Sequence, residues 1–259
     1  MLNDNGVFVI VIALSFLTKI PDEYFCTHIG DDGITSCKPT DFCNDPTVKS
    51  FEPNMDLPDS YNNWVQRFDL HCASGGKIGL IGSSLFIGWV TTLLIVPRIS
   101  DRYGRVMLMR IGNLVSFLAY TGILLTTRYE MLIACIFTLG AMATIRVQIS
   151  TLYFYELVTR KVYPRVSTVF ATCGTMPGIL IALYFKYMSK EAMTLLHISY
   201  SMLVVGTIAL FFYPEAPRFL IKSHRIDQAI TVLQSIAAAN DVDSVKVSKG
   251  HIKEKLGMR

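Results

Sequence analysis

Long apolar stretches without charged residues dominate the pattern along this chain. Three of them, Ile78–Val96, Val166–Phe185 and Ala192–Tyr213, contain 19 residues or more. Because an α-helix rises about 1.5 Å per residue, each stretch can cross the ~30 Å hydrocarbon core of a bilayer. The pattern therefore predicts at least three membrane-spanning helices.

Three further apolar stretches are shorter or interrupted. Met131–Tyr155 is broken by Arg146, and Ile111–Thr127 follows Arg110, whose long side chain can reach the membrane interface. The run 6–20 opens the chain, and a cleaved signal peptide is its alternative interpretation. The five residues before it include Asp4 and no Lys or Arg, which favours a membrane span. We predict an all-α, integral membrane bundle of six helices.

Composition and charge placement support this prediction. The hydrophobic fraction is 51%, the charged fraction is 17% and the mean hydropathy is +0.41. Basic residues gather in the connections after the second and fourth spans, which predicts that both termini lie on the inner side of the membrane. These residues are Arg98, Arg102, Arg105, Arg110, Arg160, Lys161 and Arg165. No basic patch carries interleaved aromatic residues, so we expect no nucleic-acid partner.

The polarity of the chain divides it into four parts. The first span covers residues 1–20, a polar outer segment covers 21–74, spans two to six cover 75–213, and an inner-face helix with a basic tail covers 214–259. In the last part, apolar residues recur with helical spacing from Phe219 to Ala237, opposite Lys222, Arg225 and Asp227. This spacing predicts an amphipathic helix at the membrane surface.

The outer segment holds four of the six cysteines, Cys26, Cys37, Cys43 and Cys72. An even number of cysteines outside the cytosol is compatible with two disulfides, for which three pairings exist. Four free thiols are the alternative. We expect at least one disulfide.

The connection between the second and third spans carries the most specific motif. Pro97–Arg105 reads PRISDRYGR, and it resembles the G-x-L-S/G-D-R-x-G-R-R signature of the major facilitator superfamily. Gly104 would permit a tight turn there, while Asp101 could meet a helix N-terminus or a nearby arginine. In this sequence Pro97 replaces the leading glycine and Val106 replaces the last arginine. The resemblance implies that Asp101, Arg102, Gly104 and Arg105 belong to an inner charge network that steadies one transport state; a plain basic turn is the alternative.

A second motif follows the sixth span. Pro214–Leu220 reads PEAPRFL, which resembles the P-E-S/T-P-R-W/Y/F-L segment of sugar porters and organic-ion transporters. Glu215 and Arg218, three residues apart, could pair on one helical face, although an exposed pair of this kind contributes little stability. The resemblance implies the N-terminal six-helix half of such a transporter, built from two three-helix inverted repeats.

The fourth span contributes three more candidate residues. Glu156 and Arg160 have the i,i+4 spacing of a helical ion pair, and they resemble an inner cluster that in this family couples to the signature loop. Arg146 lies ten residues before Glu156, about 15 Å deep by helical rise. An arginine at that depth is a candidate for the substrate cavity; a structural contact with a backbone carbonyl or with Gln148 is the equal alternative. His197, in the sixth span, is expected to be a buried neutral histidine.

No catalytic or metal-binding pattern is evident in the sequence. There is no nucleophile elbow, phosphate loop or HExxH motif, and the cysteine spacings do not indicate zinc. We therefore expect no enzymatic activity, no cofactor and no metal.

Two functions remain open for a chain that resembles one half of a transporter. We expect an accessory or structural subunit of a larger membrane complex, derived from an organic-ion transporter and packed against other membrane protein subunits. The alternative is a secondary transporter of small organic ions, either as the first half of a longer chain or paired with a second half. The family favours a plasma or organelle membrane, and the mitochondrial inner membrane is the alternative for a complex subunit.

Overall fold

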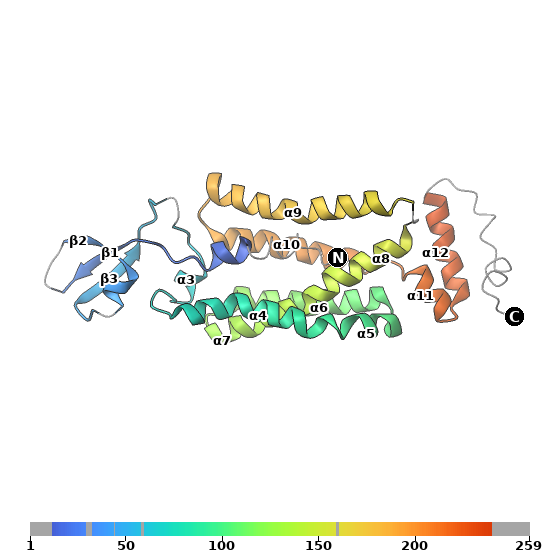
Figure 1. Cartoon of the computed structure of the whole chain (residues 1–259), viewed down its shortest axis with the longest axis horizontal. Helices are drawn as coiled ribbons and strands as arrows, with labels where there is room; N and C mark the ends of the chain where they lie inside the picture. The colour runs from blue at the N-terminus through green and yellow to red at the C-terminus, as the bar shows by residue number, and fades with distance from the viewer. Residues whose placement is uncertain (1–11, 30–32, 44, 58–59, 159–160, 240–259) are drawn as a thin grey trace.

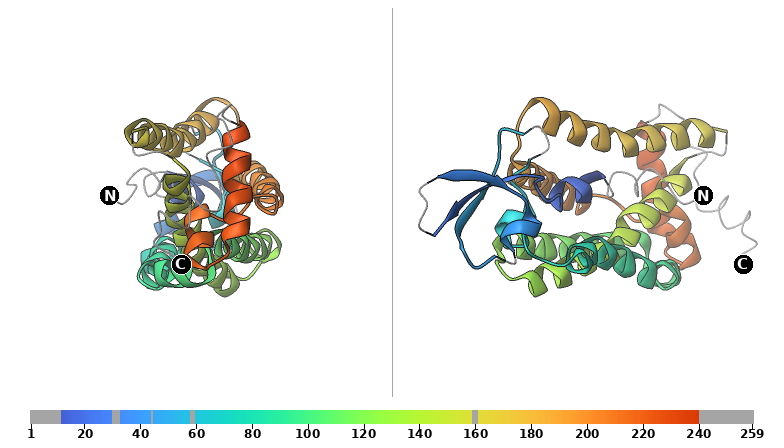
Figure 2. Two further views of the ribbon diagram at one scale, coloured as in Figure 1. Left: turned by 90° about the vertical axis from the view of Figure 1, so that its right-hand side faces the viewer. Right: turned by 60° about the vertical axis from the view of Figure 1, so that its left-hand side comes forward.

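The computed structural model describes residues 12–29, 33–43, 45–57, 60–158 and 161–239. Figure 1 shows an elongated molecule with a small β-sheet at one end and two short helices, α11 (Pro217–Lys222) and α12 (Ile226–Ala239), at the other. We call these the sheet end and the charged end. The single amphipathic helix predicted from Phe219 to Ala237 is wrong in extent, because α11 ends at Lys222 and His224, with φ of +60°, turns the chain before α12 begins. Helix α12 lies across the charged end (Figure 2).

Long apolar helices connect the two ends. Among the described residues, five helical segments are long and apolar enough to span a membrane: Gly75–Leu93 (α4), Arg105–Leu125 (α6), Tyr129–Leu157, Tyr163–Tyr187 (α9) and Ala192–Leu210 (α10). They confirm the places of the second to sixth predicted spans. Residues 12–17 are helical, but the start of the first predicted span lies outside the described residues, so that span remains a prediction.

The third long segment is not a uniform α-helix. It consists of α7 (Tyr129–Thr144), a π-helical turn at Ile145–Ile149, labelled η1, and α8 (Ser150–Leu157). A π-turn inserts one extra residue per turn and is frequent at functional sites. The turn contains Arg146, the charged residue that the sequence placed near the middle of this span.

The closest helix crossing joins α4 and α7. Gly88 and Gly140 bring the two backbones into direct contact: a Cβ atom on Gly88 would lie 2.9 Å from the Ala141 nitrogen, and one on Gly140 would lie 3.0 Å from Leu85 Cα. Beside this contact, Thr92 Oγ1 lies 2.8 Å from Thr144 Oγ1 and donates to the Ala141 carbonyl at 2.9 Å. Small residues with hydroxyl contacts are the usual means of close packing between helices in lipid.

In contrast, α9 and α10 are little covered. Only 6% of the apolar window in each is buried, compared with 44% in Tyr129–Leu157. Figure 2 shows α9 standing apart from α4, α6 and α7. Pro177 lies inside α9, which nevertheless continues as one helix. The exposed apolar surface of these two helices suits contact with lipid or with another membrane protein.

The outer segment folds into a small disulfide-bonded unit that the all-α prediction did not include. Strands β1 (Tyr24–His28), β2 (Ile34–Cys37) and β3 (Val48–Pro53) form an antiparallel sheet in the order β2-β1-β3. Disulfides join Cys26 to Cys37, between β1 and β2, and Cys43 to Cys72, beyond the short helix α2 (Pro39–Phe42). In a unit this small, cross-links compensate for a limited hydrophobic core.

A short helix, α3 (Trp64–Arg67), attaches this unit to the bundle. Asn63 precedes it, and its side-chain amide donates to the carbonyls of Phe16 (2.9 Å) and Lys19 (2.8 Å) at the end of the first helix. The Arg67 guanidinium donates to the carbonyls of Leu124 and Thr126, at the end of α6. Two polar side chains thus satisfy helix-terminal carbonyls that lack partners within their own helices.

Candidate functional site

The connection between α5 (Val96–Tyr103) and α6 consists of Gly104 alone. Its φ angle is +102°, a conformation that L side chains rarely adopt. A Cβ atom there would also lie 2.9 Å from Glu215 Oε2 and 3.1 Å from the ring of Phe219. The glycine of the signature motif is therefore required both by the backbone and by what packs against it.

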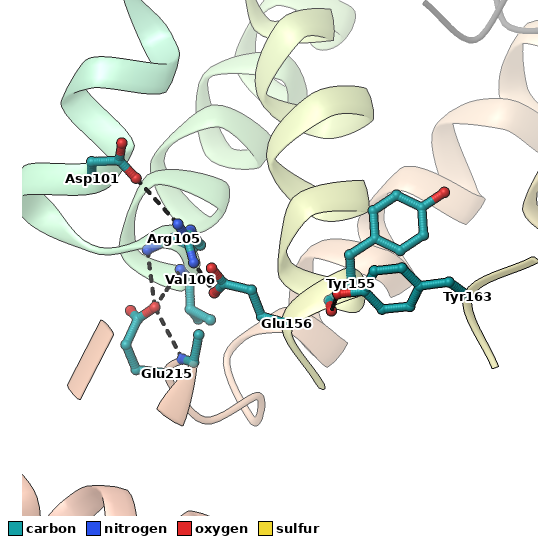
Figure 3. Close-up of polar contacts among 8 residues, drawn as sticks. Asp101, Arg105, Val106, Tyr155, Glu156, Tyr163 and Glu215 are labelled. Carbon is teal, nitrogen blue, oxygen red and sulfur yellow. Dashed lines mark hydrogen bonds and ion pairs between the residues drawn. The ribbon is translucent and has the colours of Figure 1, made fainter. Parts of the chain in front are cut away.

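Glu215 caps the N-terminus of α6 from the far end of the chain. Its Oε1 accepts hydrogen bonds from the backbone nitrogens of Arg105 (2.9 Å) and Val106 (3.1 Å), and also from that of Ala216 (3.2 Å) (Figure 3). The first amides of a helix lack intrahelical acceptors and carry partial positive charge, so a carboxylate is favoured there. The predicted helical pair of Glu215 with Arg218 is wrong, because Glu215 precedes α11 and binds α6 instead.

Arg105 connects two acidic residues. Its guanidinium lies 3.1 Å from Asp101 Oδ1, one helical turn earlier, and forms an ion pair with Glu156 on α8 (Figure 3). The side chains of Arg105 and Glu156 are 11% and 7% exposed, whereas that of Asp101 is 57% exposed. The Arg105–Glu156 pair is therefore the buried part of this group. We call Asp101, Arg105, Glu156 and Glu215 the charge cluster.

Arg110 and Tyr153 bind the end of the sixth predicted span, a contact that no motif or spacing predicted. The Arg110 guanidinium donates to the carbonyls of Leu210 (3.3 Å), Phe211 (3.0 Å) and Tyr213 (2.9 Å), where α10 ends. Tyr153 Oη donates to the carbonyl of Pro214 at 2.9 Å. A cation at a helix C-terminus meets unpaired carbonyls and the negative end of the dipole, so Arg110 does more than reach the interface.

The two departures from the signature motif have structural consequences at this end. Pro97 lies in the first turn of α5, where its missing N–H costs nothing. Val106 is 2% exposed and packs with Val96, Met109 and Ile149 in a buried cluster. An arginine at position 106 would place a charge in that cluster, so valine suits the site.

The other predicted members of the network lie at its margin. Arg102 is exposed, with its guanidinium 5.7 Å from the centroid of the Tyr103 ring. Arg218 is exposed and, with Lys222, lines a cavity of about 250 Å³ that also touches Asp101, Arg105 and Glu156. Arg160 lies outside the described residues, and so does its predicted pairing with Glu156.

Arg146 lies in the π-helical turn and is half-buried. Within the described part of the chain, no salt bridge to Arg146 is found. An arginine at this depth is costly unless it faces water or a polar partner.

His197 does not lie in the interior. Its side chain is exposed on α10, and Nδ1 lies 2.7 Å from the carbonyl of Met193, one turn earlier. The expectation of a buried histidine is therefore wrong. The bundle leaves this face of α10 uncovered, and an uncharged stretch in the sequence does not reveal which side faces inward.

Within the described ranges, the buried histidine is His71, in the outer segment. It is 8% exposed, and its Nδ1 lies 2.9 Å from the Tyr24 hydroxyl. Burial lowers the pKa of His71 below its ordinary value, while the charge of Asp69 opposes that shift. Among the residues that the structure describes, no three His, Cys, Asp or Glu side chains lie close enough together to hold a metal ion.

Comparison with known proteins assigns the chain to a family. The family model for "Sugar (and other) transporter" matches residues 46–258, which is more than half of the chain. This chain belongs to that transporter family. The charge cluster and the two motif segments lie within the matched region.

Individual relatives in this family are distant and longer. Organic cation/carnitine transporter 2 of Rattus norvegicus is 26% identical over 185 residues, covering 69% of this chain and 32% of the relative. The D-xylose transporter of Levilactobacillus brevis is 28% identical over 178 residues (66% and 37%), and organic cation/carnitine transporter 5 of Arabidopsis thaliana is 27% identical over 236 residues (87% and 44%). The chain thus spans between about a third and under half of the length of these relatives. It is a major facilitator-like membrane protein.

Proposed function

We propose that this chain forms one half of a secondary transporter for small organic ions. The observation that carries the proposal is the buried Arg105–Glu156 pair, together with the Glu215 cap. These contacts tie the α5–α6 junction to α8 and to the segment before α11, at one end of the bundle (Figure 3). In transporters built from two halves, one half rocks against the other around a site near the midplane.

The charge cluster is suited to act as a latch in such a cycle. Any movement of α8 or α11 relative to α6 must break the Arg105–Glu156 pair or the Glu215 cap. Breaking a buried ion pair leaves uncompensated charge, at a cost of about 3–5 kcal/mol. Water or a partner half that enters the adjoining cavity of about 250 Å³ could solvate these charges and reduce that cost. The cluster would therefore stabilise one state and release it when the charged end opens.

The proposal includes an orientation in the membrane. The charged end would face inward, because it carries Arg98, Arg102, Arg105 and Arg218. The sheet end would face the outer, oxidising side, which suits its two disulfides. The family does not specify which cellular membrane holds the chain.

Arg146 is the residue we propose to face the transported solute. Its charge lies about 15 Å from the charged end by helical rise, near the midplane of a bilayer. The printed names of relatives mention organic cations, carnitine and D-xylose. A guanidinium at the site would favour a solute that carries a carboxylate or another negatively charged group.

Uptake into proteoliposomes tests this proposal. The chain, purified with whatever it assembles with, should take up a labelled carboxylate-bearing organic ion saturably, and Arg146→Ala should reduce that uptake at least tenfold. Arg128→Ala, at an exposed position just before α7, is the matched control and should leave uptake unchanged. Equal uptake in Arg146→Ala and the unaltered chain would remove Arg146 from the solute pathway.

A role as an accessory subunit is the second candidate, and the uncovered apolar surface of α9 and α10 favours it. In that case the surface would pack against other subunits of a membrane complex. Gentle solubilisation, native sizing and identification of the co-migrating proteins separate the two functions. Stable co-migration with a large complex and no uptake would support the accessory role.

A further inference from the structure

The last two long helices are buried mainly near the sheet end. In α9 the buried residues are Gly178, Tyr184 and Phe185, and the last two lie close to the end of the helix. In α10 the buried residues are Ala192 and Leu196, both near its start. The helix pair is therefore enclosed chiefly around the short connection that joins α9 to α10.

A backbone bridge fastens that connection to the outer segment. The nitrogen of Asn62 donates to the carbonyl of Lys190 at 3.0 Å, and the nitrogen of Ala192 donates to the carbonyl of Asn62 at 3.0 Å. The two segments pair in parallel at Asn62 and Glu191, which are 129 positions apart in the chain. Ala192 is fully buried, so its amide depends on this partner.

Side chains reinforce the bridge from both segments. The Asn62 side-chain amide donates to both oxygens of the Glu191 carboxylate, at 3.0 and 3.1 Å. The Lys190 ammonium donates to the carbonyls of Met55 and Leu57. Hydrogen bonds that involve a charged group are stronger than neutral ones. We call Asn62, Lys190 and Glu191 the outer clasp.

The outer segment is itself attached to the other helices beside the clasp. Asn63 and Arg67 bind the ends of the first helix and of α6. The ring of Phe185, at the end of α9, packs against the rings of Phe16 and Tyr61, with centroids 4.5 Å and 5.0 Å away. The outer clasp thereby connects α9 and α10 to the first helix and α6.

We propose that the outer clasp holds α9 and α10 on the bundle and stays closed when the charged end opens. The second half of this inference rests on the proposed function, in which the charge cluster is released. The clasp shares no residue with the charge cluster, and the two lie at opposite ends of the molecule (Figure 1). The outer clasp is therefore the fixed end about which α9 and α10 can move.

Hydrogen exchange of the full chain in mild detergent, followed by mass spectrometry, measures the two fastenings separately. Asn62→Asp replaces an amide donor by a carboxylate that faces Glu191, and like charges repel. We expect exchange at the Ala192 amide to accelerate about tenfold, with exchange in α4 unchanged. Adding Glu191→Gln gives the new carboxylate an amide donor and should restore most of the protection.

Asn54→Asp is the matched control for the added charge. Asn54 Oδ1 accepts a hydrogen bond from the nitrogen of Asp56 at 3.1 Å, which a carboxylate can also accept, so exchange at Ala192 should stay the same. Unchanged exchange in Asn62→Asp, or an equal acceleration in α4, would overturn the clasp. Should Asn62→Asp fail to fold, Lys190→Met removes the ammonium and keeps the stem, and no acceleration at Ala192 in that variant would also overturn it.

Glu156→Gln tests whether the clasp stays closed when the charge cluster breaks. Exchange should accelerate at the charged end and stay unchanged at Ala192. Faster exchange at Ala192 in this variant would contradict a fixed outer end. None of these measurements requires transport, so a chain that takes up no solute would overturn the proposed function and leave the clasp to be decided by hydrogen exchange.

Discussion

The Glu215 carboxylate accepts a hydrogen bond at 2.9 Å from the backbone nitrogen of Arg105, which lies 110 residues earlier in the chain. The same oxygen also binds the nitrogen of Val106. Glu215, which follows the sixth predicted span, thereby caps the N-terminus of α6, the helix that forms the third predicted span. The two motif segments of the family are thus two sides of one contact in the folded chain.

Removal of the Glu215 carboxylate should destabilise the charged end. We expect Glu215→Ala to lower the free energy of unfolding by about 1–2 kcal/mol, because the first amides of α6 lose both an acceptor and a negative charge. Thermal unfolding in detergent measures the loss. Glu130→Ala, at an exposed acidic position in the first turn of α7, is the matched control and should cost less than half as much. Equal losses would mean that the Glu215 contact adds nothing specific.

The Arg105–Glu156 pair should behave as a coupled unit. Arg105→Met or Glu156→Gln alone leaves one buried charge without its partner, and we expect each to cost about 3–5 kcal/mol. The double variant should cost much less than the sum of the two, by at least about 2 kcal/mol. A double-mutant cycle on unfolding free energies measures this coupling. Additive losses would show that the two side chains do not interact in the membrane.

Gly104 should tolerate no side chain. Gly104→Ala places a methyl group on a residue with φ of +102° and against Glu215 Oε2, so we expect a loss of about 1–3 kcal/mol. Gly206→Ala is the control, since a Cβ atom there meets nothing within 4 Å inside a helix, and it should be neutral or slightly stabilising. A neutral Gly104→Ala would contradict the described turn.

The outer segment should lose stability in mild acid. The pKa of His71 is lowered from 6.5 by burial, so the unfolded state binds a proton more readily than the folded state. Stability is then fully present above pH 6.5 and falls as the pH drops below that value. Hydrogen exchange of the β1 amides at pH 7.5 and pH 5 measures the change.

Two asparagine variants separate His71 from the general effect of acid. His71→Asn keeps a side chain that can bond to Tyr24 but does not titrate, so the acid-dependent part of the exchange should disappear. The control substitution, His28→Asn, changes a residue that is only partly buried at the end of β1. It should leave the acid-dependent part of the hydrogen exchange unchanged. An unchanged pH dependence in His71→Asn would exclude His71 as its cause.

The sequence predicted the long helices well because lipid imposes a simple requirement. Every backbone polar group in the hydrocarbon core must be bonded within its own helix, so a span must be long and apolar. Ala192–Leu210 and Gly75–Leu93 could therefore be located from uncharged stretches alone. The sequence could not show that His197 faces outward, because α10 is apolar on all sides.

Other features depend on partners that are distant in the sequence. The partner that Glu215 binds lies outside its own motif, which is why spacing suggested Arg218 instead. The strand β2 has only four residues, too few for a reliable alternating pattern, and the disulfides that stabilise it could have paired in three ways. The π-helical turn at Arg146 could not be predicted either, because such turns are rare and no pattern in this apolar stretch marks one.

The native mass of the purified assembly tests the central claim most directly. A mild-detergent extract, sized by native mass spectrometry, should contain an assembly in which a second six-helix bundle covers α9 and α10. That bundle can be another copy of this 29.0 kDa chain, a different chain or a further part of the same polypeptide. Benzophenone-maleimide attached to the exposed Cys173 of α9 should cross-link this helix to the second bundle on illumination, whereas the partly buried Cys135 should be labelled less. A monomer of 29.0 kDa that forms no cross-link at Cys173 would contradict the proposal that this chain works as one half of a transporter.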